Sequence, residues 1–204
     1  MMIKPIDFIE NFDFYFPDYI NTAPWNIVNE LDKILLEKLK LLSADYKIEG
    51  TTAIHKTAVI EEGVTLKGTI IISENCYVGA HAYLRGPILF GKSVKIGPGS
   101  EIKQSFISDN SAVAHFNYIG NSLIGQNINF EAGSICANHY NERKNKNISV
   151  KYKEDIINTH SDKFGSLLGD NSKVGANAVL SPGTILDKNS IVKRLQLIEQ
   201  LVEE

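Results

Sequence analysis

A repeat of six residues constrains the fold of this sequence more than any other feature. An aliphatic or aromatic residue occupies every sixth position from residue 54 to residue 102, at Ile54, Ile60, Leu66, Ile72, Val78, Leu84, Phe90, Ile96 and Ile102. A period of six matches neither the period of about 3.6 residues of an amphipathic helix nor the two-residue alternation of a simple hairpin. The pattern instead predicts a prism in which each hexad forms a short strand and a turn, with one large side chain pointing inward.

This pattern resembles the hexapeptide-repeat proteins, whose fold is a left-handed parallel β-helix. The resemblance implies that three hexads, roughly 18 residues, form each triangular coil. It covers about residues 50 to 192, because the pattern returns after an interruption as Leu168, Val174, Leu180, Leu186 and Val192. We therefore expect an all-β fold, with a left-handed β-helix at residues 51–192 and short N- and C-terminal helices.

The Asn- and Gly-rich passage from residue 114 to residue 140 continues the same repeat. After Ile102 the inward positions are Ile107, Val113, Ile119, Ile124, Phe130 and Cys136, so that two steps are five residues long instead of six. Asn and Gly suit the corners of a prism, where the backbone angle φ is often positive. The passage is therefore predicted to be regular coil and not a loop.

The two ends of the chain have a different periodicity. Residues 25–42 place one apolar face at Val28, Leu31, Leu35, Leu39 and Leu42, and Pro24 suits the first turn of a helix. We expect residues 1–50 to form an N-terminal segment whose amphipathic helix caps one end of the prism, where backbone groups are unpaired. Residues 193–204 have apolar residues at helical spacing, at Leu195, Ile198 and Val202, which predicts a C-terminal helix.

Residues 139–165 interrupt the hexads. We interpret them as a long inserted loop, with a small hairpin through "ISVKY" and "IINT". Long ordered loops in compact proteins are often functional, and a disordered loop is the alternative.

Charge and cysteine content exclude several classes of protein. The chain has 204 residues with 21 Lys and Arg against 24 Asp and Glu, a formal net charge of −3, which is not the basic field that binds nucleic acid. No apolar run is long enough to span a bilayer, and the N-terminus lacks the pattern of a signal peptide. Cys76 and Cys136 fall on inward positions and are expected in the core. These features predict a cytoplasmic protein with no membrane insertion.

Three basic residues are predicted to form a column. Lys67, Arg85 and Lys103 each follow an inward residue and are spaced by 18 residues, so they lie on one face of three successive coils. Like charges in register destabilise each other, which indicates an anion such as phosphate beside them. The alternative is that the long side chains splay into water at little cost.

His115 is predicted to point to a different side of the prism from this column. The two can meet only if a neighbouring chain brings its own face alongside, which predicts a closed cyclic oligomer, most naturally a homotrimer, with sites between subunits. Tyr118 and Asn129 are expected at the same edge of the coils as His115. A plain surface histidine is the alternative for His115.

The stretch from residue 100 to residue 140 is similar to the C-terminal acetyltransferase domain of the bifunctional N-acetylglucosamine-1-phosphate uridyltransferase/glucosamine-1-phosphate N-acetyltransferase family, which makes UDP-N-acetylglucosamine. The nucleotidyltransferase domain has no counterpart in the residues before the prism. The matching motif positions are Lys103, His115, Tyr118, Asn129, Ala132, Gly133 and Asn138, with further matches at Arg85 and Lys163.

This resemblance implies a chemistry for each matched position. His115 would remove the proton from an attacking amine, since a neutral imidazole is a suitable base near neutral pH. The backbone N–H at Ala132 would stabilise the oxyanion. The resemblance further implies that Arg85, Lys103 and Lys163 hold a sugar phosphate or nucleotide sugar, that Tyr118 and Asn129 orient the sugar, and that acetyl-CoA, the acyl donor, passes Asn138 and Ala176.

Two departures from the family motif lie on the side of the acyl donor. His139 stands where the family has Tyr, and Ala176 stands where it has Ser. These changes keep a second interpretation open, namely a non-catalytic sugar-nucleotide-binding or assembly module derived from the same domain. His55, His81 and His160 are expected at the surface, and the sequence lacks the HxxxxH ligands of hexapeptide carbonic anhydrases, so no metal site is predicted.

Overall fold

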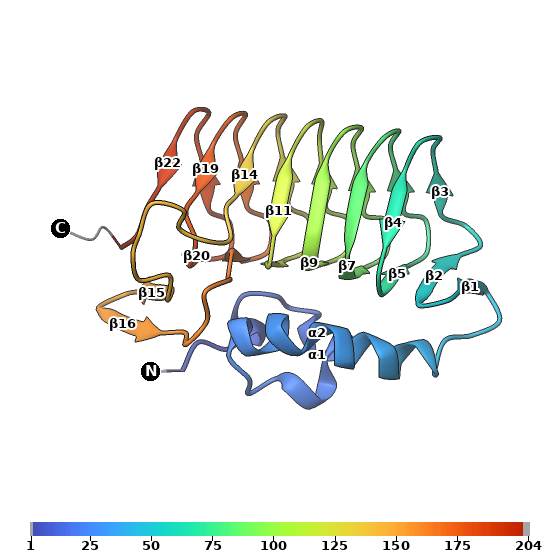
Figure 1. Cartoon of the computed structure of the whole chain (residues 1–204), viewed down its shortest axis with the longest axis horizontal. Coiled ribbons are helices and arrows are strands. Elements are labelled where there is room, and N and C mark those ends of the chain that lie inside the picture. The colour runs from blue at the N-terminus through green and yellow to red at the C-terminus, as the bar shows by residue number, and fades with distance from the viewer. Residues whose placement is uncertain (1, 202–204) are drawn as a thin grey trace.

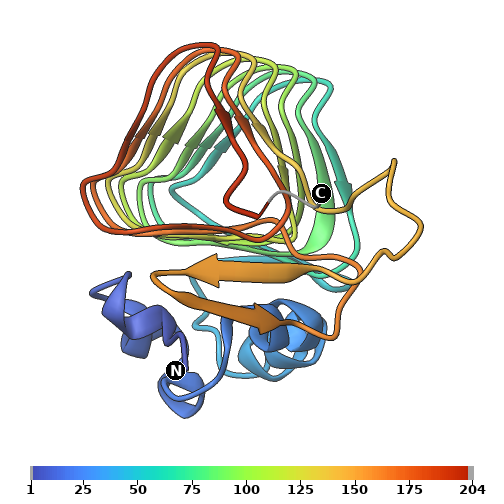
Figure 2. The same ribbon diagram turned by 90° about the vertical axis from the view of Figure 1, so that its left-hand side faces the viewer.

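The chain folds as a three-sided β-helix with a helical segment packed along one side. The computed structural model describes residues 2–201. Short strands stack coil on coil with parallel pairing, and the end-on view shows the triangular cross-section (Figures 1 and 2). The predicted fold class, a left-handed hexapeptide-repeat β-helix, is confirmed in this main part of the chain.

One side of the prism is a seven-stranded parallel sheet, which we call the open face. Its order is β21-β18-β13-β10-β8-β6-β3. The strands are β3 (Val59–Ile60), β6 (Tyr77–Val78), β8 (Lys95–Ile96), β10 (Ala112–Val113), β13 (Asn129–Phe130), β18 (Lys173–Val174) and β21 (Ile191–Val192).

A 13-stranded sheet forms the other two sides, because β7 and β9 run across the corner between them. The first side, the basic face, contains β4 (Thr65–Lys67), the start of β7 (Tyr83–Phe90) and of β9 (Glu101–Ile107), β11 (Tyr118–Gly120), β14 (Ile135–Cys136), β19 (Val179–Leu180) and β22 (Leu197–Ile198). The second, the covered face, contains β2 (Thr52–His55), β5 (Ile70–Ile72), the ends of β7 and β9, β12 (Leu123–Ile124), β17 (Ser166–Leu168) and β20 (Thr184–Leu186), with β1 (Tyr46–Glu49) antiparallel to β2.

The inward positions of the hexads fill the prism. From Ile72 to Cys136, and again at Leu168, Val174, Leu180 and Val192, every predicted inward residue is buried. Ile54, Ile60, Leu66 and Leu186 are only partly buried, because they lie in the first and last coils, where fewer neighbouring coils cover them. Cys76 and Cys136 are free thiols in this core, as expected. Most of the stability of the prism therefore comes from one continuous apolar column.

The corners contain the residues that tolerate a positive φ angle. Asn110, Asn127 and Asn171 follow one another on successive coils of one corner with φ of +57°, +56° and +63°. Asn visits this left-handed region more readily than most residues because its short polar side chain can hydrogen-bond locally. The prediction that the Asn-rich passage is regular coil is confirmed.

The N-terminal segment covers a side of the prism and not its end. It comprises η1 (Pro5–Asp7), α1 (Phe12–Tyr15), η2 (Pro17–Tyr19) and α2 (Pro24–Leu39), with Pro24 in the first turn as expected. Helix α2 lies along the covered face and packs on β5, β7 and β9 (Figure 1). The prediction of a capping helix at the end of the prism is therefore wrong.

The reason lies in the side chains that the covered face turns outward. A column of apolar residues stacks there, one for each coil, and packs with the N-terminal segment in a second core: Ala53, Ile71, Leu89, Phe106, Leu123, Leu167 and Ile185. An end coil offers mainly backbone to a helix, whereas this face offers a long apolar surface that matches the apolar stripe of α2.

The excursion at residues 139–165 adds to the same cover. Its hairpin is confirmed, as β15 (Ser149–Tyr152) pairs antiparallel with β16 (Asp155–Asn158). Ile148 and Val150 are fully buried, and β15 packs on β20 beneath the prism (Figure 2). Most of the excursion is thus an ordered part of the cover.

The C-terminal helix predicted for residues 193–204 is wrong for the described residues 193–201. Residues 197–198 form strand β22, which pairs in parallel with β19, Val179 facing Leu197 and Leu180 facing Ile198. Ile198 lies six residues after Val192, so the hexad continues and the helical spacing was a coincidence. Residues 202–204, with Val202, lie outside the described residues. Within residues 2–201, no helix combines the length and the apolar character needed to cross a membrane.

Candidate functional site

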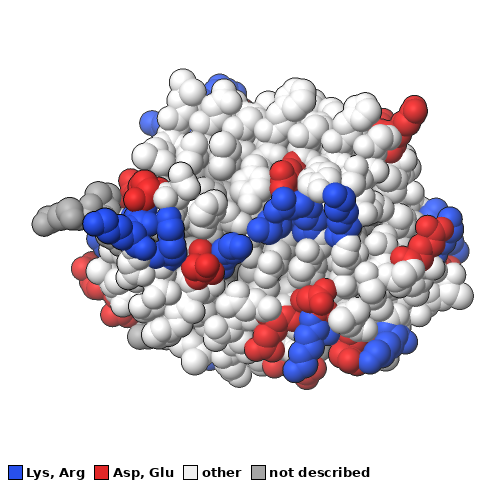
Figure 3. All heavy atoms as spheres, viewed as in Figure 1, with Lys and Arg blue, Asp and Glu red and all other residues white. Residues whose placement is uncertain are grey.

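The predicted column of basic residues is present on the basic face. Lys67 pairs in register with Arg85 across β4 and β7, and Arg85 with Lys103 across β7 and β9. Lys163, at the end of the excursion, comes close enough for its charge to lower the pKa of Lys103. Figure 3 shows these strands from outside, with a row of Lys and Arg along the lower edge of the face. We call Lys67, Arg85, Lys103 and Lys163 the basic row.

The basic row has a surplus of positive charge. Glu101 forms an ion pair with Arg85, 3.3 Å from carboxylate oxygen to Nε, and Tyr83 lies beneath Lys67 with 5.0 Å from Nζ to the ring centre. Among the described residues, the other three members form no ion pair with a carboxylate. The pKa of Lys103 is lowered first by burial and then by its two cationic neighbours. An anion bound here would relieve this repulsion.

Tyr118 and Asn138 lie next to the basic row. Tyr118, on β11, is in register with Glu101, and its pKa is raised by burial and by that carboxylate. The Tyr118 hydroxyl and the Asn138 amide meet above Gly120, where an added Cβ would lie 2.5 Å from the hydroxyl and 2.9 Å from the amide. Gly120 is in register with Lys103, so the basic column ends where this polar pair begins.

Asn138 is held rigidly on this side of the prism. It is 4% exposed, and its Nδ2 donates to Oδ1 of Asn121 at 2.6 Å. The resemblance places Asn138 on the path of the acyl donor, whereas the structure groups it with Tyr118 and the basic row. Gly120 and Asn121 were missed from the sequence. The signal for Gly120 was its position one coil after Lys103, at the five-residue slip.

His115 lies at the corner between the open face and the basic face, which we call the His corner. Its side chain is exposed, and its carbonyl accepts the N–H of Gly133 at 3.0 Å. The carbonyl of Ala132 in turn accepts the N–H of Asn177 at 3.0 Å. His115, Ala132 and Ala176 therefore occupy the same corner position on three successive coils. Ala132 and Ala176 are neighbours in the stack although 44 residues separate them in the sequence, because the excursion is inserted between their coils.

Glu131 fastens this corner, and sequence reasoning did not single it out. One of its carboxylate oxygens accepts the backbone N–H of Ala176 at 2.8 Å, and both oxygens accept from Arg194, at 2.6 and 2.5 Å. The backbone N–H of Ala132 has no hydrogen-bond acceptor within residues 2–201, and the residue is partly exposed. That group is thus available as a donor to a bound molecule.

Asn129 and Tyr118 flank the His corner from opposite sides. Asn129 is exposed on the open face, in register with Ala112 and Lys173, while Tyr118 is on the basic face. The basic row lies at the far edge of that second face. A single chain therefore does not bring His115 next to the basic row, because the two lie at opposite edges of the basic face.

Two smaller predictions can be compared with the structure. His81 and His160 are exposed as expected, but His55 is buried, with Nδ1 2.9 Å from the Thr57 hydroxyl and its ring against Tyr46. Within the described part of the chain, no cluster of three or more His, Cys, Asp or Glu is arranged to hold a metal ion.

Known proteins with similar sequences match most of the prism. Residues 48–157 match the family described as the GMPPB C-terminal domain. A bifunctional sugar-1-phosphate nucleotidylyltransferase/acetyltransferase of Sulfurisphaera tokodaii is 34% identical over 78% of this chain and 41% of its own length. Bifunctional proteins GlmU of Methanococcus maripaludis and Methanococcus aeolicus are 37% and 39% identical over 89% of this chain and 44% of their own length.

The chain thus spans less than half the length of these curated relatives. The matched family segment begins at the first strands of the prism and ends inside the excursion, so it includes Lys67, Arg85 and Lys103 and the corner positions His115 and Ala132, but not Ala176. From its hexad repeat, its three-sided coil and this match over more than half of its residues, the chain belongs to the hexapeptide-repeat family of the GMPPB C-terminal domain.

Proposed function

We propose that this chain is an acetyltransferase that moves acetyl from acetyl-CoA to the amine of an amino-sugar phosphate or nucleotide sugar. The single observation that carries the proposal is the basic row with its uncompensated charge beside the half-buried Tyr118 and the buried Asn138. Charge-assisted hydrogen bonds from Arg and Lys suit a phosphate, and a phenol and an amide suit the hydroxyls of a sugar. The three relatives described above bear names that include acetyltransferase or GlmU, which supports the same class.

The chemistry needs a base and an oxyanion donor. The nitrogen of the attacking amine must lose a proton during acyl transfer, and the exposed imidazole of His115 is the candidate base, since imidazole is a suitable base near neutral pH. The neutral amine adds to the thioester carbonyl, and His115 takes the proton that the nitrogen loses as the N–C bond forms. The tetrahedral oxyanion then collapses, the C–S bond breaks, and His115 passes that proton to the departing thiolate. The N–H of Ala132, one coil away, is the donor for the oxyanion.

The acyl donor would lie on the open side of the His corner. A hollow of about 580 Å³ there is bordered by Asn129, Lys173, Lys193 and Arg194 and adjoins Gly175, next to Ala176. Lys173 and Lys193 suit the phosphates of acetyl-CoA, whereas Arg194 is already paired with Glu131, which also lines the hollow. Ala176 would allow close approach because its side chain is only a methyl group.

The site would be completed in a homotrimer. His115 and the basic row border opposite edges of the basic face, and a second prism packed along that face would set the His corner of one subunit opposite the basic row of the next. A heterologous contact of this kind closes into a ring when the rotation allows it. The proposal further takes the chain to be a cytoplasmic protein, which agrees with two free buried thiols.

A non-catalytic sugar-nucleotide-binding or assembly module remains the second candidate. The observation that favours it is the placement of Asn138, which is hydrogen-bonded within the acceptor side instead of lining a path for the acyl donor. In this case the basic row would still bind a sugar phosphate, but acetyl-CoA would not bind.

The decisive experiment measures thiol release from acetyl-CoA with glucosamine phosphates and amino-sugar nucleotides as acceptors. We expect His115→Ala to reduce the rate by about 10²- to 10⁴-fold, the usual contribution of a general base. His81→Ala is the matched control, since His81 is also exposed at this corner, two coils earlier. Equal rates for His115→Ala and the unmodified chain would remove His115 from the mechanism.

Calorimetry separates the two candidates. Heat of binding with the sugar phosphate but none with acetyl-CoA would identify the binding module. Sedimentation tests the assembly, because a monomer with full activity would contradict a site shared between subunits.

A further inference from the structure

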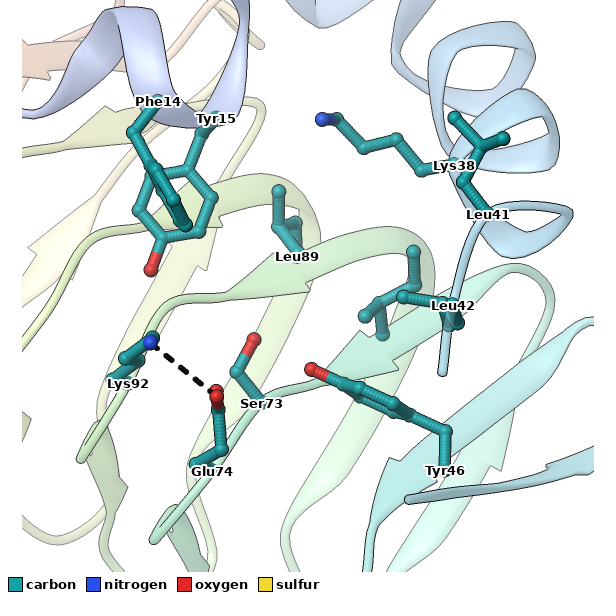
Figure 4. A pocket seen from close by; sticks show the side chains of 11 residues that line it. Phe14, Tyr15, Lys38, Leu41, Leu42, Tyr46, Ser73, Glu74, Leu89 and Lys92 are labelled. Atoms are coloured by element: carbon teal, nitrogen blue, oxygen red, sulfur yellow. Dashed lines mark ion pairs between the residues drawn. The ribbon is translucent and has the colours of Figure 1, made fainter. Parts of the chain in front are cut away.

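A hollow on the covered face lies apart from the proposed catalytic site. It has a volume of about 260 Å³ and opens between α1, the end of α2 and the strands β5 and β7 (Figure 4). Its floor is formed by the buried residues Ile71, Ser73 and Leu89. Phe14 and Leu41 stand exposed at its rim. Because the basic row and the His corner border other faces of the prism, a ligand here would not contact them.

Lys38 is the distinctive residue of this hollow. Figure 4 shows its side chain reaching from α2 across the opening toward Tyr15 of α1. The ammonium group is half-buried and lies 5.6 Å from the ring centre of Phe16. Within residues 2–201 no carboxylate comes close enough to form an ion pair with it, although the charge of Asp18 acts on it from farther away. Burial of the ammonium group lowers the pKa of Lys38, and the negative charge of Asp18 opposes this effect.

The other charged groups around the hollow already have partners. Lys92 forms an ion pair with Glu74 at 3.3 Å (dashed in Figure 4). Tyr15 donates its hydroxyl hydrogen to Asp109 across the back of the hollow. Tyr46 and Ser73 also line the hollow, but neither side chain carries a charge. The charges that line the hollow therefore balance except at Lys38, whose ammonium group has no carboxylate partner among the described residues.

We propose that this hollow binds a small carboxylic acid with an apolar body, whose carboxylate pairs with Lys38 and whose body lies on Ile71, Leu89 and Leu42. A single ammonium matches a single negative charge, whereas a phosphate dianion would require several donors. The volume is slightly below the range of about 300–1,000 Å³ that is usual for small-molecule sites, which limits the body to about one ring or a short alkyl chain.

Binding of 3-phenylpropionate to the full chain tests this proposal by calorimetry and ligand-observed NMR. We expect one binding event per chain, and we expect the neutral amide, 3-phenylpropanamide, to bind at least about tenfold more weakly, because it offers no charge to the ammonium. Lys38→Met, which keeps an apolar stem but no charge, should weaken binding of the acid by about the same factor and leave binding of the amide unchanged. Lys40→Met is the matched control, since Lys40 lies on the same helix end and pairs with Glu37 outside the hollow.

The melting temperature gives a second readout. A ligand that contacts α2 and the prism together binds only the folded chain, so the acid should raise the melting temperature in proportion to the logarithm of its concentration. Lys38→Met should melt no lower than the unmodified chain, because it removes a half-buried charge. Equal affinity of the acid for Lys38→Met and for the unmodified chain, or no binding at millimolar concentration, would overturn the proposal. Acetyl transfer is not part of this test, so its outcome does not depend on the proposed enzymatic function.

Discussion

Phe106 offers a direct test of how the N-terminal segment is held on the prism. It belongs to the outward apolar column of the covered face, is 0% exposed, and packs on Tyr15 and Phe16 with both pairs of ring centres 5.0 Å apart. Replacing a buried Phe by Ala costs about 3–5 kcal/mol of unfolding free energy. Aromatic pairs add about 0.5–1.5 kcal/mol each beyond the buried area, which points to the upper part of that range.

Urea denaturation of Phe106→Ala measures this loss. For a chain of this size the expected decrease in melting temperature is roughly 6–20 °C. Phe116→Ala is the matched control, because Phe116 is 73% exposed at the His corner and its removal should change the unfolding free energy by less than about 0.5 kcal/mol.

Amide hydrogen exchange shows which part of the chain loses stability in Phe106→Ala. Amides of α2 should lose protection in Phe106→Ala before those in the interior of the prism, because α2 is attached mainly through this column. A loss below about 1 kcal/mol, or an equal loss in Phe116→Ala, would refute the account of the covered face.

Three further predictions follow from single sites. Lys103→Met should stabilise the chain at pH 7, because the pKa of Lys103 is lower in the folded chain than in the unfolded chain. The unmodified chain therefore gains stability as the pH rises from the folded-state pKa toward the ordinary lysine value, and urea titrations should show the advantage of the variant shrinking over that range. Burial raises the pKa of both Cys76 and Cys136 to about 12, so iodoacetamide at pH 8 should label neither thiol in the native chain and both in denaturant, and mass spectrometry showing rapid native labelling would contradict their burial. Leu195→Asn should raise the unfolding free energy by about 1 kcal/mol, because Leu195 has φ of +60° and an exposed side chain, and Asn is less strained in that conformation. A lower denaturation midpoint for this variant would show that Leu195 makes a contact that stabilises the fold.

The prism was predictable because its signal is periodic and local. Each coil repeats the same contacts, so one large inward side chain for every six residues specifies the interior without any knowledge of distant partners. The same counting placed Lys67, Arg85 and Lys103 in register, as the strand pairing of β4, β7 and β9 confirms. It also predicted correctly that the coil continues through the two five-residue steps.

Helical spacing was a weaker guide at the ends of the chain. At residues 193–201 the same apolar residues satisfy both a helical and a hexad pattern, and Ile198 follows the hexad because β19 offers an open edge for pairing. For α2 the apolar stripe was read correctly from Val28 to Leu35, but a stripe specifies only that a partner surface exists. The outward apolar column that serves as this partner is spread over residues 53–185.

The candidate site shows the same division. The sequence by itself determined the coil, its corners and the register of the basic column, because these depend on spacing within the repeat. Only the tertiary structure decided that Lys163 returns beside Lys103, that Ala176 stacks on Ala132 across the excursion, and that Asn138 meets Tyr118 over Gly120. Where an inserted segment rejoins the stack depends on packing between residues far apart in the chain, and no local period records such contacts.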